Sequence, residues 1–188
     1  WVFTDKESGR VVSNCHKLPA AKFNRRRLTV DEITEAYSDL LTKLKALYPN
    51  LNVVFSVSPI RHWKDGAHEN TISKSTLLLA VDALQNQFGN VHYFPAYELL
   101  MDELRDYRFY AEDMLHPNQT AIDYIWIQFF ENYISESVFG LMNEICSIQK
   151  GLQHRPFNPN TENHQKFLNQ LDLKIKAIKN QYPFIKFC

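Results

Sequence analysis

The chain has 188 residues, of which 45% are hydrophobic and 13% aromatic. This length and composition can bury a sizeable core, which excludes an intrinsically disordered protein. Lysine plus arginine and aspartate plus glutamate both number 21, so net charge gives no pull toward nucleic acid or an anionic membrane. The one basic run, residues 25–27, fits a solvated approach to a helix.

Membrane insertion and disulfide stabilisation are also unexpected from the sequence. No apolar stretch is long enough to span a bilayer, so we expect no membrane partner. The chain opens at Trp1 without a methionine, so a targeting signal could lie upstream. Its three cysteines, Cys15, Cys146 and Cys188, are odd in number and widely spaced. This pattern argues against a disulfide framework or a cysteine-rich zinc site and favours a reducing, cytoplasmic compartment.

The first quarter of the chain is predicted to hold two short strands and a helix. Residues 1–3 fit the end of a strand, and residues 10–13 fit a second strand after a turn at Gly9. Thr29, followed three residues later by Glu32, forms a capping-box pattern that predicts the start of a helix. Apolar residues then recur at helical spacing up to Pro49: Ile33, Tyr37, Leu40, Leu41, Leu44 and Leu47.

The next segment alternates strands with helices. Residues 51–57 form an apolar, β-branched run typical of a strand buried on both faces, and residues 91–95 form a second one. Between them, residues 60–71 are polar and fit a loop, and Ser73 can cap a helix that ends near Gln87. This order predicts an α/β fold in which the two strands lie side by side and parallel.

The rest of the chain is predicted to be helical. A short helix fits residues 98–104, a long aromatic-rich helix follows Pro117, and another fits residues 136–149 with Gly151 at its end. A final helix buries Phe167, Leu171, Ile175 and Ile178. We therefore divide the chain into an α/β domain, residues 1–150, and a helical extension, residues 151–188.

The turn at residues 113–117, Asp-Met-Leu-His-Pro, is the strongest candidate for chemistry. A carboxylate three residues before a histidine can accept the Nδ1 proton and stabilise the imidazolium formed during proton transfer. The turn follows the strand at residues 91–95, on the side where parallel sheets bind ligands. The structural alternative is that Asp113 caps the coming helix and His116 is a surface residue.

Several longer stretches carry a resemblance to a known family. They are Val-Val-Ser-Asn-Cys-His-Lys-Leu-Pro at 11–19, Phe-Ser-Val-Ser-Pro-Ile-Arg-His-Trp-Lys-Asp-Gly at 55–66, Tyr-Phe-Pro at 93–95, residues 102–110 and His-Arg-Pro-Phe-Asn-Pro at 154–159. Together with Asp-x-x-His-Pro, they resemble the GSCFA family within the SGNH, or GDSL-like, hydrolases. The resemblance covers nearly the whole chain.

This resemblance implies a fold and a reaction. The fold is a three-layer parallel sheet of flavodoxin-like type, here incomplete at its N-terminus and starting in the family's third strand. The reaction is hydrolysis of a small or glycan-linked acyl ester without a cofactor, with His116 as general base oriented by Asp113. The Gly-Ser-Cys-Phe-Ala motif that supplies the family's serine does not occur in this chain. We therefore expect the nucleophile upstream, and the alternative is a non-catalytic binding module.

Three further residues are candidates for binding substrate or an oxyanion. Asn14 can donate to an oxyanion, although a turn residue is the simpler interpretation. Arg61 and His62 follow the strand at 51–57, and a guanidinium there can hold a carboxylate or phosphate. The alternative for Arg61 is a structural ion pair with Asp65, Asp102 or Glu103. A metal held by His62, Asp65 and His68 is the weakest hypothesis, and we predict no metal.

Loss of the first strands would leave an apolar sheet edge unpaired. Such edges tend to pair with another chain. We therefore expect self-association through this edge and little or no esterase turnover by these residues alone, because base and orienter without a nucleophile retain little catalysis.

Overall fold

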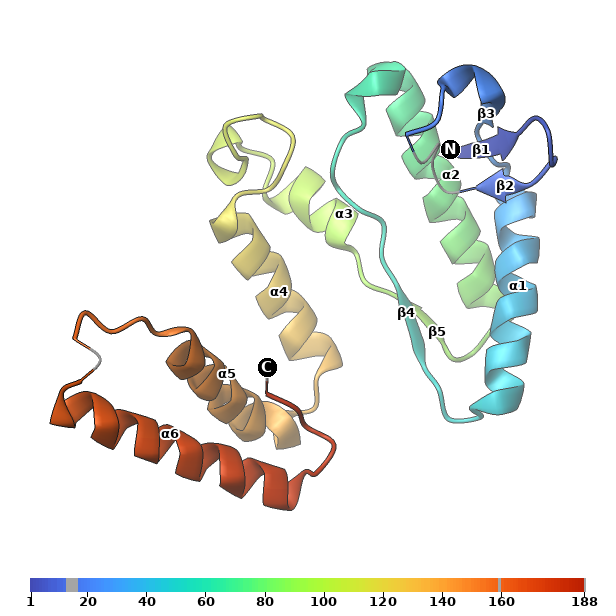
Figure 1. Ribbon diagram of the computed structural model, residues 1–188. Helices are drawn as coiled ribbons and strands as arrows, with labels where there is room; N and C mark the ends of the chain where they lie inside the picture. Colours follow the sequence, from blue (N-terminus) through green and yellow to red (C-terminus); the bar gives the residue numbers. More distant parts are fainter. Residues whose placement is uncertain (13–16, 159, 188) are drawn as a thin grey trace. The chain divides into compact units, whose positions relative to one another are not determined.

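The computed structural model describes residues 1–12, 17–158 and 160–187. The chain forms two compact units, Trp1–Gln128 and Phe129–Cys188 (Figure 1). This division falls earlier than the one near residue 150 that the sequence indicated. It falls earlier because the helix spanning residue 150 packs against the last helix of the chain, so both belong to the second unit.

A small antiparallel sheet opens the first unit. Strand β1 (Val2–Asp5) lies between β2 (Val11–Val12) and β3 (Phe23–Arg26), and a short 3-10 turn, η1 (Ala20–Lys22), precedes β3. The first two strands were predicted, but β1 belongs to this separate sheet and not to the parallel sheet that the family resemblance implied. The basic run was assigned wrongly, since Arg25 and Arg26 lie in β3.

Ion pairs explain why a basic segment forms β3. The Arg25 guanidinium binds the Asp65 carboxylate with both terminal nitrogens, and its central carbon lies 4.2 Å from the centre of the Trp1 ring. Arg26 holds Glu32 through two hydrogen bonds of 2.8 and 2.6 Å. The partners come from later in the chain, so local composition does not reveal them.

The helix α1 (Val30–Leu47) begins as predicted. The Thr29 hydroxyl accepts from the Glu32 amide at 3.2 Å, and the Glu32 carboxylate accepts from the Thr29 amide at 2.9 Å, which completes the capping box. Helix α2 (Gly66–Gln87) follows a 3-10 turn, η2 (Trp63–Asp65). It begins inside the segment predicted as a loop, because polar residues of its first turns, including the buried Asn70, masked the helical pattern.

The predicted parallel pair is confirmed. Strand β4 (Val53–Phe55) pairs in parallel with β5 (Val91–Tyr93), with Val53 opposite Val91 and Phe55 opposite Tyr93. A core of Leu41, Leu84 and Val91 joins the two helices to this pair, with Val53, Phe55 and Phe88 packed against it. The fold is therefore mixed α/β, with a two-stranded parallel sheet and a three-stranded antiparallel one among the described residues.

A second cluster supports the segment after β5. Helix α3 (Ala96–Glu98) continues into a π-helical turn, η3 (Leu99–Glu103), and a 3-10 turn, η4 (Tyr107–Phe109), precedes α4 (Gln119–Tyr133). Leu100, Leu104 and Ala121 are buried together, and they tie this segment to the start of α4. The helices predicted at 98–104 and after Pro117 are both present.

The second unit contains η5 (Glu136–Val138), α5 (Phe139–Gln153) and α6 (Glu162–Gln181). Ile148, Leu171 and Ile178 form its core. Gly151 does not end α5 as predicted, because the helix continues to Gln153. Instead, a Cβ at Gly151 would lie 2.8 Å from a methyl carbon of Leu171, so the glycine permits close approach of the two helices. No described helix has the length and apolarity required to cross a membrane.

Candidate active site

The segment between η4 and α4 forms a short two-armed loop (Figure 1, yellow-green). Tyr110 and Pro117 form an isolated antiparallel bridge. The Ala111 amide donates to the His116 carbonyl at 2.8 Å, and the Asn118 amide donates to the Phe109 carbonyl at 2.9 Å. The two arms are thus pinned together, and the turn between them carries Asp113 and His116.

The Asp113 carboxylate holds this turn from inside. Its Oδ1 accepts from the Leu115 amide at 2.9 Å and from the His116 amide at 3.0 Å. Met114, between Asp113 and Leu115, has a φ of 57°, in the left-handed region that residues other than glycine seldom adopt. Because such a residue costs free energy, the two amide hydrogen bonds are needed to hold the turn in this shape.

The second oxygen of Asp113 holds the histidine ring. Asp113 Oδ2 lies 2.5 Å from His116 Nδ1. An ionised carboxylate only accepts hydrogen bonds, so Nδ1 must carry the proton, and the neutral ring then has its lone pair on Nε2. The His116 side chain is 57% exposed. Among the described residues Nε2 has no hydrogen-bond partner, so the geometry leaves it available as a proton acceptor.

Hydrogen bonds keep the Asp113 carboxylate ionised. The backbone amide of His116 contributes most, followed by the Leu115 amide and the His116 ring, and together they lower the pKa of Asp113 to about 2. A carboxylate with this pKa is charged throughout the neutral range, which is the state that orients and stabilises a histidine during proton transfer.

The structural alternative for Asp113 fails in one respect. The helix α4 is capped by Asn118, whose Oδ1 accepts from the Ala121 amide at 3.1 Å and whose Nδ2 donates to the Arg108 carbonyl at 2.6 Å. Sequence reasoning missed this role, although asparagine is among the preferred N-cap residues. Since Asn118 caps the helix, Asp113 is left to hold its own turn and the His116 ring.

No nucleophile accompanies the pair within the described part of the chain. None of its hydroxyl or thiol groups hydrogen-bonds to His116. Ser56 and Ser58 instead line a separate pocket, and Ser73 lies in α2. The described residues thus form the contact between His116 and Asp113 that the sequence predicted, and no hydroxyl or thiol group joins it.

Arg61 lies beside this loop and pairs with no carboxylate among the described residues. It lines a pocket of about 190 Å³ with Met101, Arg105, Asp106, Tyr107 and Tyr110. Its one hydrogen-bond contact within the described residues is weak, from Nη2 to the Met101 sulfur at 3.6 Å. Asp65 pairs with Arg25, and Glu103 accepts from the Tyr124 hydroxyl at 2.5 Å. Within the part of the chain that the structure describes, Arg61 thus forms no ion pair with Asp65, Asp102 or Glu103, the partners considered for it.

His62 lies elsewhere. It lines a pocket of about 250 Å³ between α1, the end of β4 and α2, and its backbone amide donates to Asn70 Oδ1 at 2.9 Å. The pairing of Asp65 with Arg25 removes that carboxylate from the metal hypothesis, and no group of three metal-ligating side chains occurs among the described residues. Asn14 lies outside the described residues.

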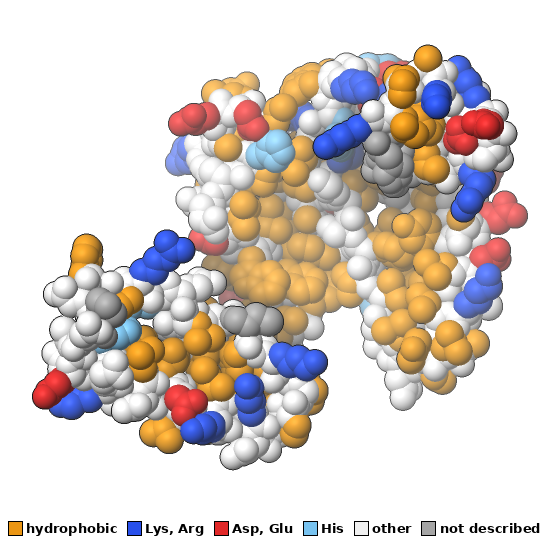
Figure 2. All heavy atoms as spheres, viewed as in Figure 1, with side chains coloured by type: hydrophobic (Ala, Val, Ile, Leu, Met, Phe, Trp, Pro, Cys, Tyr) orange, Lys and Arg blue, Asp and Glu red, His pale blue; other side chains and the backbone are white. Residues whose placement is uncertain are grey.

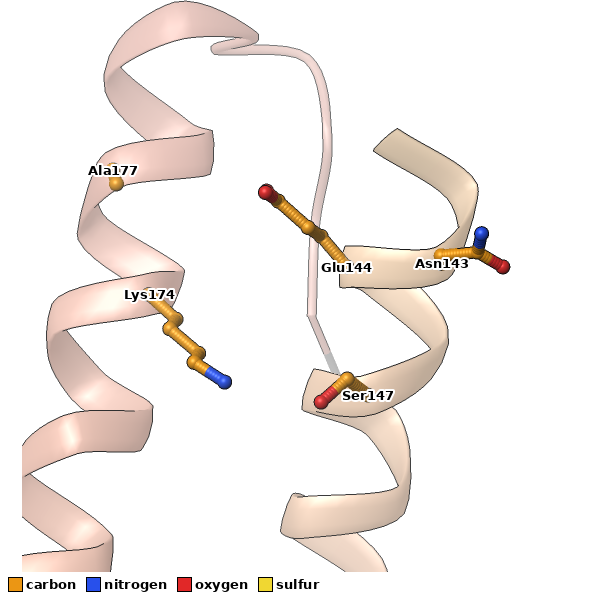
Figure 3. Close-up of a pocket in the computed structure, with 5 residues that line it drawn as sticks. All are labelled: Asn143, Glu144, Ser147, Lys174 and Ala177. Atoms are coloured by element: carbon orange, nitrogen blue, oxygen red, sulfur yellow. The ribbon is translucent and has the colours of Figure 1, made fainter. Parts of the chain in front are cut away.

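The second unit has a surface pocket of its own. It measures about 400 Å³ and lies between α5 and α6, lined by Asn143, Glu144, Ser147, Lys174 and Ala177 (Figure 3). The side chain of Glu144 extends toward α6, whereas Asn143 points away from it. Although both helices are described, Glu144 and Lys174 form no ion pair. The lining lacks a histidine, so the acid–base candidates remain in the first unit.

Comparison with protein-family models gives the relationship of the chain to known proteins. Residues 1–129 match the model of the GSCFA family. The chain belongs to the GSCFA family. Residues 145–187 of this GSCFA chain match a separate model, described as the C-terminal domain of GSCFA domain proteins. The first match ends where the two compact units divide, and the second lies within the second unit. Comparisons with curated proteins and with solved structures found no match.

Proposed function

We propose that this GSCFA chain supplies the acid–base part of an ester hydrolase of SGNH type. His116 acts as the general base, and Asp113 orients it. The observation that carries the proposal is the short contact between Asp113 Oδ2 and His116 Nδ1, which leaves Nε2 of the exposed His116 side chain as the proton acceptor.

The proposed reaction needs a serine from a segment outside these residues. Its hydroxyl oxygen attacks the ester carbonyl while His116 Nε2 takes the hydroxyl proton. The tetrahedral intermediate expels the alcohol, which receives that proton from Nε2, and an acyl-enzyme remains. Water then attacks the acyl carbon, again losing a proton to Nε2, and the acid is released as the serine hydroxyl recovers its proton. Asp113 stabilises the imidazolium at each step.

The pocket at Arg61 supports a substrate class. Tyr110 lies opposite Pro117 in the isolated bridge, and Pro117 directly follows His116, so this wall of the pocket is close to the histidine. Arg61 and Arg105 offer positive charge, and Tyr107 and Tyr110 offer aromatic faces. A small or glycan-linked acyl ester fits this combination, with Arg61 able to hold a carboxylate or phosphate if the substrate carries one.

The proposal includes the three-layer SGNH sheet. Helices α1 and α2 pack against the parallel pair β4–β5. Further parallel strands added beside this pair would give the larger, helix-covered sheet. In this proposal the strands that complete the sheet come from the same outside segment as the serine.

Hydrolysis of p-nitrophenyl acetate tests the proposed function. We expect no turnover above buffer with this chain alone, and turnover when the upstream coding sequence is included. In that longer protein, His116→Ala should lower kcat/KM by about 10²–10⁴-fold, the usual contribution of a general base. Asp113→Asn should also lower it, because the amide cannot stabilise the imidazolium as a carboxylate does.

His68→Ala provides the matched control, because His68 is an exposed histidine in α2. It should leave turnover unchanged. Full activity of the His116→Ala variant would contradict the assignment of the base. Turnover by the 188-residue chain that His116→Ala abolishes would instead show that the nucleophile lies within it.

A non-catalytic binding module is the alternative function. One observation favours it: Asp113 holds the amides of its own turn, so the loop would keep its shape without any catalytic role. If the longer protein hydrolyses no acyl ester, yet Arg61→Ala weakens binding of an acylated glycan, the module is the better description.

We also propose self-association through the free edge of β4. This strand pairs with β5 on one side and with no other described strand. Val54 on the strand, Leu51 just before it, and Tyr37 and Leu40 on α1 are exposed. Figure 2 shows hydrophobic side chains gathered over α1. Unpaired edges of this kind readily recruit another strand.

Light scattering over a concentration series measures this association. We expect dimers or larger species, and Val54→Lys should shift them toward monomer because a charge on the edge opposes strand pairing. Val54→Thr, which keeps the β-branched shape, is the matched control and should have a smaller effect. A monomer at every concentration would contradict edge pairing.

A further inference from the structure

The first unit buries a charged side chain, Lys74, that has no part in the proposed reaction. The Lys74 side chain, on α2, is 4% exposed, although lysine is almost never fully buried without a partner. Its Nζ donates to the Ser58 carbonyl at 2.5 Å. Within the described residues, no carboxylate lies within ion-pair distance of this ammonium.

One carbonyl does not satisfy an ammonium group. Lysine has three N–H donors, so two remain after the bond to Ser58. A backbone carbonyl also brings only a partial negative charge, and a buried full charge is costly unless it is paired. Burial accordingly lowers the pKa of Lys74. Among the described residues, no negative charge balances the Lys74 ammonium.

The surroundings of Lys74 indicate what could supply that charge. Lys74 lines the pocket of about 250 Å³ between α1, the end of β4 and α2. Its walls are mainly apolar: Ile33, Tyr37, Phe55, Val57, Leu77, Val81 and Leu84. Besides Lys74, the polar lining residues are Ser56, Ser58 and His62. The Ser58 hydroxyl accepts from the Ile60 amide at 3.3 Å, which leaves its proton free to donate.

We propose that this pocket binds a short aliphatic carboxylate, with the carboxylate at Lys74 and Ser58 and the hydrocarbon tail against the apolar walls. A single ammonium matches a single negative charge, and the Ser58 hydroxyl provides a second donor. Ligand pockets typically combine such apolar walls with a few polar groups. The small volume selects a short chain, and the proposal is independent of His116 and Asp113.

Calorimetric titration of the 188-residue chain with sodium hexanoate tests the proposal, and 1-hexanol and sodium acetate serve as comparison probes. Hexanol keeps the tail without the charge, and acetate keeps the charge without most of the tail. We expect hexanoate to bind at least tenfold more tightly than either one, because a charge-assisted hydrogen bond and the buried tail both contribute.

The Lys74→Met variant should lose the preference for the carboxylate. It keeps the length and apolar bulk of the side chain, so hexanoate should bind at least tenfold more weakly while hexanol binds at least as well. Lys43→Met, at an exposed position of α1, is the matched control and should change neither affinity.

Two results would overturn the proposal. One is hexanoate binding no better than hexanol in the unmodified chain, which needs no variant to fold. The other is unchanged hexanoate affinity in Leu77→Phe, which places a larger ring at the wall of the pocket and should weaken binding about tenfold.

Discussion

The first unit holds two ionisable sites of opposite construction. At Asp113 and His116 both side chains are about half-exposed, and the carboxylate is satisfied by two amides and the imidazole ring. At Lys74 the ammonium is buried and has one carbonyl partner among the residues that the structure describes. The exposed pair has its hydrogen bonds and opposite charges satisfied but lies open to solvent. The buried cation is shielded from solvent but has no negative charge beside it among the described residues.

This difference shows how solvent decides what a charged group needs. Water solvates an exposed pair, so local hydrogen bonds are enough to fix its geometry. Such a pair contributes little to the free energy of unfolding. A buried cation lacks that solvation and makes the folded state less stable until a counter-charge arrives. The first site is therefore to be tested by local observables, and the second by the stability of the whole unit.

The larger effect on stability is expected at Lys74. Lys74→Met should raise the free energy of unfolding by about 1 kcal/mol or more at pH 7, because it removes an unpaired charge from an apolar site. The lost hydrogen bond to the Ser58 carbonyl offsets part of this gain. Urea unfolding of both proteins, in the absence of carboxylates, measures the difference.

The pH dependence of that difference has a definite sign. Burial lowers the pKa of Lys74 in the folded state below its ordinary value of 10.5. The unfolded chain therefore binds the proton more tightly, so the penalty is fully present below the folded pKa and disappears as pH rises through 10.5. The advantage of Lys74→Met should shrink over the same range. An advantage that is constant with pH, or equal in Lys43→Met, would show that the charge is not its cause.

How well each site could be predicted follows from the distance between its parts in the sequence. Asp113 and His116 are three residues apart, so one turn brings them together and the motif alone predicted their contact. The environment of Lys74 is made by α1, β4 and α2, which no local pattern reveals. The signal available was spacing: Asn70 and Lys74 fall on the helical stripe of Leu77, Val81 and Leu84.

The same reasoning applies to the fold. The capping box at Thr29 and the apolar run at β4 are local signals, and both predicted their elements correctly. The strand β3 was missed because ion pairs to Asp65 and Glu32 support it, and those partners lie in later elements. The start of α2 was missed because its first turns are polar. Patterns report burial and capping, but they do not report partners that folding brings from elsewhere.

The smaller effect is expected at the Asp113 turn, and it is local. Because amide hydrogen bonds hold the pKa of Asp113 at about 2, the carboxylate stabilises the turn above its ordinary pKa of 3.8 and loses this role as pH falls through about 2. At pH 3 only about a tenth of the carboxyl groups should be protonated, against most of them at an ordinary pKa. The amide NMR signals of Leu115 and His116 report this directly, since both donate to Asp113 Oδ1. Asp113→Asn should remove their titration and speed their hydrogen exchange slightly, because the amide oxygen accepts more weakly than a carboxylate.

Asp106→Asn is the matched control: Asp106 accepts from the Arg108 amide in the neighbouring turn, so its variant should alter the Arg108 signal and leave Leu115 unchanged. Signals of Leu115 and His116 that are mostly titrated by pH 3 would show that the two amides do not hold the carboxylate as the structure describes, and the orientation of His116 by Asp113 would lose its local support.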